Sequence, residues 1–245
     1  MPVAIPNFDY SYLRKGKPVF VPTKIGRRIG REIKEAVEGT FAFDPIYFHL
    51  RRGGHVAAMH HHRDNHSFAR IDISNFFYSI SRRRVQSALD RAKVGNARFY
   101  AKWSTVVSPF GDPQYALPYG FVQSPILASL VVATSDLGRH LLGLPASIKV
   151  GVYVDDISLS SDDETELQRA YDSILGVIAS DGLAVSPAKL RPPAHEIDIF
   201  NCDLAHGMAS VTDDRINAFL LSNPSQEAEN AFIAYCASVE MGNQV

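Results

Sequence analysis

Three aspartates stand where strands should end. Asp155 and Asp156 lie together inside a β-rich stretch, 148–161, with the spacing of a tight hairpin, and Asp72 closes another β-rich run, 67–73. Adjacent carboxylates repel one another, and a buried carboxylate without a partner is costly. Two Mg²⁺ ions about 3.5–4 Å apart would satisfy such a group and could activate a hydroxyl and stabilise a leaving phosphate. The aspartates therefore predict a two-metal phosphoryl-transfer site.

The elements that must position these aspartates follow from hydrophobic periodicity and turn residues. Strands, helices and a strand–turn–strand unit succeed one another from residue 67, which favours an α+β domain with an antiparallel sheet and helices on one face. The other expected elements are a hairpin over 10–22, helices over 25–38, 55–63, 81–93, 96–106, 124–142, 161–182, 213–220 and 225–239, and strands over 196–200 and 208–212.

Composition excludes several classes of protein. The 245 residues are 46% hydrophobic and 21% charged, as in ordinary globular proteins. No apolar run is long enough to cross a bilayer, and the first residues lack a secretion signal. Cys202 and Cys236 have no metal-like spacing, so we expect free thiols in a reducing cytoplasm.

The net charge of −1 hides a strong asymmetry. Residues 1–110 contain 19 Lys and Arg against 8 Asp and Glu, whereas residues 111–245 contain 6 against 18. The first part is suited to phosphate backbones and the second to divalent metal ions. Solvated surface charge is the alternative explanation.

Four segments together resemble the reverse transcriptase family. Phe68–Ile80, Leu117–Leu127, Tyr153–Asp156 and Gly182–Lys189 are similar to its motifs A, B, C and D, in the family's order. The bacterial retron, group II intron and defence-associated members are the most similar in character. The resemblance implies RNA-directed DNA polymerase activity on a right-hand palm with basic fingers, and two Mg²⁺ ions, with Mn²⁺ as the alternative. It also implies the domain division: fingers at 1–66, palm at 67–212 with a fingers insertion at 81–115, and C-terminal helices at 213–245.

Roles follow from matching positions in the family. Asp72, Asp155 and Asp156 match its catalytic, metal-binding carboxylates. Phe77 matches the steric gate that excludes ribonucleotides, with a core aromatic as the alternative. Lys189 matches a lysine beside the triphosphate, with a solvated lysine as the alternative.

The resemblance also assigns residues that contact substrates. The expected nucleotide-binding residues, besides Phe77 and Lys189, are Lys15, Lys17, Gly120 and Gln123. The expected template and primer contacts are Arg51, Arg52, Tyr119, Ser124, Pro125 and Tyr153.

Several positions depart from the family pattern. Tyr119 replaces the usual Gln, Ser186 replaces a common Asn, and Pro18 and Val19 follow the basic hairpin in place of an arginine. Three functions therefore stay open: templated synthesis, template-independent or protein-primed synthesis, and a non-catalytic scaffold for RNA or protein. The family character suggests anti-phage defence.

About thirty residues follow position 212, too few for a three-helix thumb. A structured RNA, a partner protein or a second copy would then complete the enzyme. An apolar stripe supports this, unless it packs on the chain's own palm: Ala228, Phe232, Tyr235, Cys236 and Val239. The histidines at 60–62, with His49, His55 and His66 nearby, predict a polar patch facing the template rather than a zinc site.

Overall fold

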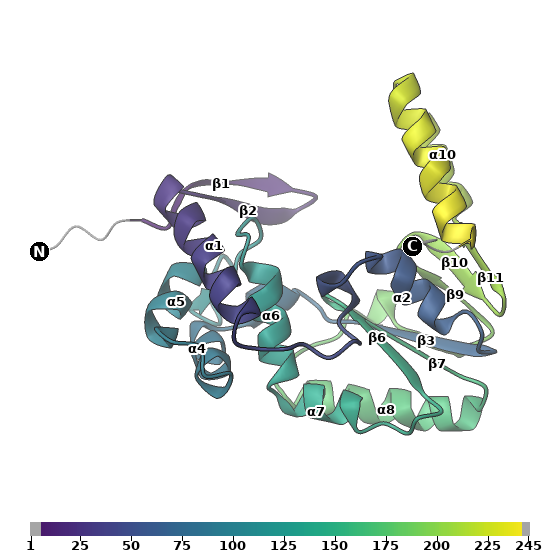
Figure 1. Cartoon of the computed structure of the whole chain (residues 1–245), viewed down its shortest axis with the longest axis horizontal. Helices are drawn as coiled ribbons and strands as arrows, with labels where there is room; N and C mark the ends of the chain where they lie inside the picture. The colour runs from purple at the N-terminus through teal and green to yellow at the C-terminus, as the bar shows by residue number, and fades with distance from the viewer. Residues whose placement is uncertain (1–5, 242–245) are drawn as a thin grey trace, which may run out of the picture. The chain divides into compact units, whose positions relative to one another are not determined.

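A computed structural model describes residues 6–241 and divides them into two units, each built from three separate stretches of chain. The helical unit contains residues 6–44, 74–142 and 177–184, and the sheet unit contains 45–73, 143–176 and 185–241. Figure 1 labels their elements. This division by compactness does not test the expected functional boundaries of fingers, palm and C-terminal helices, which stay a prediction.

The helical unit begins with the predicted hairpin. Strands β1 (Phe8–Arg14) and β2 (Lys17–Pro22) pair antiparallel, and Lys15 and Gly16 form the turn with φ of 50° and 74°. Two residues with positive φ are typical of the tight turns that match strand twist. Helix α1 (Lys24–Glu38) follows, and the Oγ1 of Thr23 caps it by accepting a hydrogen bond from the Gly26 amide.

Three helices and a short two-stranded sheet come next in this unit. They are α3 (Phe76–Ser79), α4 (Arg82–Arg91) and α5 (Ala97–Ser104), with strands β4 (Val106–Val107) and β5 (Tyr115–Ala116). Ser81 caps α4 as expected, since its Oγ accepts from the Arg84 amide.

The single helix expected over 124–142 is wrong. The structure has α6 (Ser124–Ala133) and α7 (Asp136–Leu142). The amide and the hydroxyl of Ser135 both donate to the Val132 carbonyl, which in a continuous helix would accept from the Asp136 amide. Ser124 is also not the cap: Gln123 holds that position.

The sheet unit is built around a four-stranded antiparallel sheet in the order β6-β7-β3-β8, which confirms the α+β prediction. Its strands are β3 (Ser67–Asp72), β6 (Lys149–Tyr153), β7 (Asp156–Ser161) and β8 (Arg191–Ala194). Its helices are η1 (Phe48–Leu50), α2 (Gly54–His62), most of α8 (Glu164–Ser180) and η2 (Pro187–Lys189). Figure 1 shows α8 running along one face of the sheet.

A second, three-stranded sheet completes this unit. Strands β9 (Glu196–Ile199), β10 (Cys202–Ala205) and β11 (Met208–Val211) form an antiparallel meander, and α9 (Asp213–Leu220) and α10 (Gln226–Met241) follow. Strand β8 was not expected, because Arg191–Ala194 contains two prolines, and β10 was not expected either. Both cysteines are free thiols, as expected.

Most of the apolar stripe of helix α10 packs against other parts of the chain. Val239 is buried, and Phe232, Tyr235 and Cys236 pack against the buried core of the three-stranded sheet. Phe232 also stacks on Phe219 of α9, with ring centroids 4.1 Å apart. Packing on the chain itself, rather than on a partner, therefore accounts for this stripe.

Candidate active site

Asp72 closes strand β3 and is buried. It is 2% exposed, and it pairs in register with Asp156 on the neighbouring strand β7. Alternation along β3 places Phe68, Arg70 and Asp72 on the same face of the sheet. The Nζ of Lys189 lies 2.8 Å from Oδ2 of Asp72, so an ammonium compensates this buried charge.

The β6–β7 turn holds Asp155 next to the end of β3. The carbonyl of Asp155 accepts a hydrogen bond of 2.9 Å from the Ile73 amide. Val154 has a φ of 59°, which is strained for a β-branched residue, and its amide donates to Nδ1 of His49 at 3.1 Å. The fold thus brings Asp72, Asp155 and Asp156 to one edge of one sheet.

Arg70 is the residue of this site that the sequence interpretation missed. Its Nε and Nη2 each lie 2.6 Å from Oδ1 of Asp156, its Nη2 lies 4.0 Å from Oδ2 of Asp72, and its Nη1 lies 3.6 Å from Oδ2 of Asp198. A guanidinium can bridge several carboxylates because its five donors point in fixed directions. The signal was available: a charged residue two positions before Asp72 on a strand must share its face.

Asp156 has a perturbed acidity. Burial raises the pKa of its carboxyl to about 6, Arg70 opposes that rise, and the charges of Asp155 and Asp72 add to it. Three carboxylates meet only two cationic side chains here, Arg70 and Lys189, so a divalent cation would improve the charge balance of the site.

The carboxylates fit Mg²⁺ only as a partial ligand set. Among residues 6–241, no three His, Cys, Asp or Glu side chains could hold a metal ion by themselves. Mg²⁺ in proteins usually takes one or two carboxylates and completes its shell with water and substrate phosphates. Asp72 and Asp155, at adjacent strand ends, match that donor chemistry.

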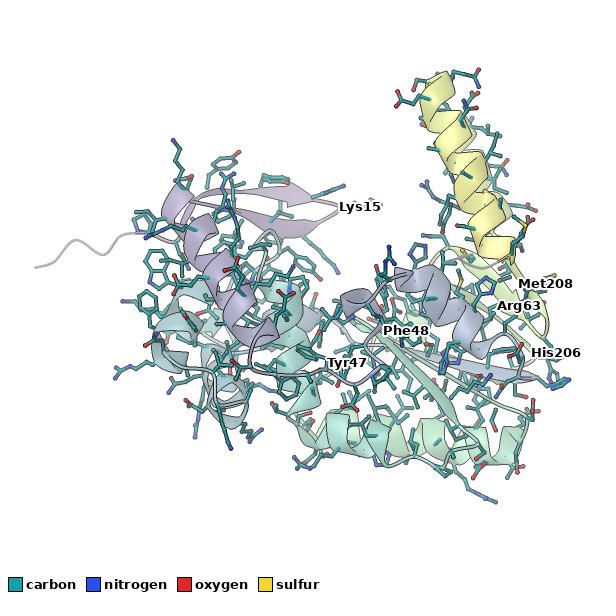
Figure 2. The ribbon with its side chains drawn as sticks, in the orientation of Figure 1. Lys15, Tyr47, Phe48, Arg63, His206 and Met208 are labelled. Atoms are coloured by element: carbon teal, nitrogen blue, oxygen red, sulfur yellow. The ribbon has the colours of Figure 1, made fainter. Side chains whose placement is uncertain are left out.

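The helical unit brings four of the other predicted residues together. Lys17 donates from Nζ to the Tyr119 hydroxyl at 3.1 Å, and the Tyr119 ring meets Phe77 edge-on with centroids 4.8 Å apart. Gly120 is required here: its φ is 101°, and a Cβ would lie 2.2 Å from the Phe20 carbonyl. Lys15 lies at the hairpin tip, in Figure 2. Phe77 is 7% exposed, consistent with either a gate or a core aromatic.

The start of helix α6 is less accessible than expected. Gln123 is buried, and its side-chain amide donates to Ser104 rather than facing outward. Ser124 is also buried, and its hydroxyl has no hydrogen-bond partner in the described part of the chain. Pro125 is half-buried at the second position of the helix.

In the sheet unit, the predicted template contacts lie around one end of β6. Arg51 and Arg52 are exposed, and Arg51 donates to the Pro45 carbonyl and covers the Phe48 ring. Tyr153 is half-buried and packs against the rings of His49, His55 and Phe200, at centroid distances of 5.7, 6.1 and 5.1 Å.

The predicted polar patch of histidines is wrong for His62. This ring is 1% exposed and lies between two serines of β7, with Nδ1 2.8 Å from Ser160 Oγ and Nε2 2.9 Å from Ser158 Oγ. Burial holds its pKa well below the usual value. His60 contacts the Val239 carbonyl through Nε2, so α2 uses these histidines to join the sheet and α10.

A family model described as reverse transcriptase (RNA-dependent DNA polymerase) matches residues 5–199. No curated protein matches the chain. In the part of the chain that the structure describes, no helix has the length and apolar character needed to span a membrane.

Solved structures of larger proteins are similar to this chain, among them a telomerase and two foamy viral enzymes. A telomerase from Candida albicans in complex with a fragment of telomeric RNA is 12% identical, with a TM-score of 0.50, and the match covers 78% of this chain. Foamy viral protease-reverse transcriptases, one with double-stranded DNA and one with an RNA/DNA hybrid, are 18% and 20% identical, with TM-scores of 0.48 and 0.45 over 84% and 65% of this chain. The matched regions are 37%, 30% and 19% of those chains, so the likeness concerns one part of larger proteins.

Proposed function

The chain belongs to the reverse transcriptase (RNA-dependent DNA polymerase) family, and from that premise we propose that it extends a primer with dNTPs on an RNA template. The observation that supports this best is the edge of the four-stranded sheet. There, Asp72 pairs in register with Asp156, and the Asp155 carbonyl accepts from the Ile73 amide. A non-catalytic fold has no need of three carboxylates that require two cationic side chains to balance them.

Asp72 and Asp155 would hold the metal ions in this proposal, and Asp156 would anchor Arg70 instead. Bound Mg²⁺ would supply Lewis-acid stabilisation of the attacking hydroxyl and the leaving pyrophosphate. Lys189 would exchange its contact with Asp72 for one with the triphosphate. Lys15 and Lys17 would bind phosphate oxygens, and Phe77 would exclude a 2′-hydroxyl.

Template-independent or protein-primed synthesis is a second candidate. Tyr119, which stands where the family usually has Gln, turns its hydroxyl to Lys17 and its ring to Phe77. A side chain engaged in this way is less available to contact a template base pair. Extension of a DNA primer with and without an RNA template separates the two candidates: product that needs no template, or whose sequence ignores it, supports the second.

A scaffold that binds RNA or protein is the candidate of a different class. Magnesium-dependent thermal stabilisation distinguishes it, because a scaffold needs no metal. A melting temperature that does not change between EDTA and Mg²⁺, together with absent synthesis, would favour the scaffold.

We also propose a cytoplasmic, bacterial anti-phage role, with a structured RNA, a partner protein or a second copy bound at the C-terminal helices. Exposed apolar side chains support a partner at the C-terminal helices: Leu221 is 82% exposed and Ile233 is 66% exposed. Light scattering coupled to gel filtration of the protein purified from its host tests for such a bound partner. A bare monomer that makes long products in high salt would contradict it.

A further inference from the structure

A hollow of about 380 Å³ opens beside helix α4 in the helical unit. Four arginines line it, three from α4 and one from α7: Arg83, Arg84, Arg91 and Arg139. Ser87 and Thr134 add hydroxyl groups to the same wall. None of these residues belongs to the carboxylate site or to the predicted substrate contacts.

Two of the four arginines are already balanced. Arg139 forms an ion pair with Asp136, and Arg84 is half-buried beside the charge of Asp181. Asp181 is itself engaged, since its Oδ2 accepts from the Leu137 amide at 3.0 Å. Within residues 6–241, Arg83 and Arg91 form no ion pair, and both side chains are exposed. The hollow therefore carries uncompensated positive charge.

The spacing along α4 orders this charge in a row. Arg83, Ser87 and Arg91 recur every four residues, which places them on one side of the helix. The ten residues of α4 span about 15 Å. One strand of a duplex carries a phosphate about every 3.4 Å along its axis, so Arg83 and Arg91, which are about 12 Å apart along the helix, match phosphates three or four positions apart.

Two neighbouring hollows also contact α4, and both include Gln86 in their lining. One contains Arg82, whose guanidinium covers the Tyr115 ring at 3.7 Å, and the other contains Arg98, Lys102 and the 47%-exposed Phe99. Residues 81–104 hold seven basic side chains and one acidic one. Basic and aromatic groups side by side are typical of surfaces that bind nucleic acid.

We propose that helix α4 and the hollow beside it bind the phosphodiester backbone of a nucleic-acid strand, separately from the residues assigned to the carboxylate site. One guanidinium group can donate hydrogen bonds to two phosphate oxygens at once, which suits arginine to this ligand. A nucleic acid is favoured over an acidic protein segment because the charges recur in a row along one helix and an exposed aromatic ring lies in the adjoining hollow.

The test measures binding of fluorescent single-stranded RNA, duplex RNA and single-stranded DNA in EDTA without dNTPs. The double variant Arg83→Gln/Arg91→Gln is compared with Arg169→Gln, the same change at an exposed position of α8. We expect at least a tenfold rise in Kd for the double variant. The slope of log K against log salt should fall by about 1.4 for single strands or 1.8 for duplexes, and the control should change neither.

Arg91 also donates to the carbonyl of Thr134, the residue that ends α6, so the double variant removes this contact as well. The single variant Arg83→Gln avoids this and should lower the slope by about 0.7–0.9. Unchanged affinity and slope in folded variants would overturn the inference. It would also be overturned if the double variant lost binding of a poly-glutamate peptide but still bound RNA and DNA as the wild type does. The three probes identify the strand type. DNA synthesis is not measured, so failure of the polymerase proposal is a separate result.

Discussion

The ammonium of Lys189 lies 2.8 Å from the carboxylate of Asp72, although 117 residues separate them in the chain. Asp72 is nearly inaccessible, whereas the side chain of Lys189 is 52% exposed. A half-exposed cation can leave its partner when a stronger one arrives. The pair thus links the charge balance at this end of the sheet to the metal and nucleotide that the proposed reaction requires.

Replacing Lys189 tests this link. Lys189→Met should lower the free energy of unfolding in EDTA by about 1–2 kcal/mol, between the values for exposed and for buried pairs. Mg²⁺ should then stabilise the variant more than it stabilises the wild type, because the metal replaces the missing charge. Urea unfolding with and without Mg²⁺ measures both effects. Equal stabilisation of the two proteins would show that Lys189 and the metal do not share a carboxylate.

Phe77 should control the choice of sugar. Phe77→Val should raise the ratio of ribonucleotide to deoxynucleotide incorporation at least tenfold, because the ring no longer fills the space of a 2′-hydroxyl. Valine is preferred to alanine, since a buried Phe→Ala change costs about 3–5 kcal/mol. Competitive incorporation of matched rNTP and dNTP provides the ratio. If the variant folds and the ratio stays the same, Phe77 is a core residue only.

Tyr119 should act through its contact with Lys17. Tyr119→Phe removes one hydrogen bond, worth about 1 kcal/mol, and should raise the KM for dNTP about fivefold with kcat little changed. Lys17→Ala should have a larger effect, and the two changes together should be less than additive. Steady-state kinetics of the four proteins give the coupling. Strict additivity would mean that the 3.1 Å contact has no part in nucleotide binding.

His62 should make stability depend on pH. Burial lowers the pKa of His62 in the folded protein. Near pH 6.5 the imidazole therefore takes up a proton in the unfolded chain but stays neutral in the folded one. Its contribution is complete above pH 6.5 and is lost as pH falls below that value, by up to about 1.4 kcal/mol per pH unit. The pKa values of His49, His55 and His61 are also lowered by burial, so the wild type is compared with His62→Gln to isolate the contribution of His62. Urea unfolding at pH 7.5 and 5.5 should show a smaller difference in the variant; equal differences would contradict this role.

Strand alternation and turn residues were enough to predict β3, the β6–β7 hairpin and the helices that begin at clear caps. The pairing of Asp72 with Asp156 depends on register between strands far apart in sequence, which no local pattern encodes. The resemblance implied only that Asp72, Asp155 and Asp156 share one site.

Other features could not be predicted because tertiary contacts decide them. The break after α6 involves Ser135, whose amide and hydroxyl both bond back to the Val132 carbonyl. The burial of His62 depends on two serines almost a hundred residues away. Arg70 was different, since its place on the face of Asp72 follows from alternation alone.

Primer extension by Asp155→Asn tests the central claim most directly. The wild type should extend a DNA primer on an RNA template with Mg²⁺, and the variant should be slower by a factor on the order of 10²–10³ or more. Its circular dichroism and unfolding midpoint should match those of the wild type, because the Asp155 backbone contact to Ile73 is kept. Synthesis by the folded variant at the wild-type rate would contradict the assignment of the carboxylates.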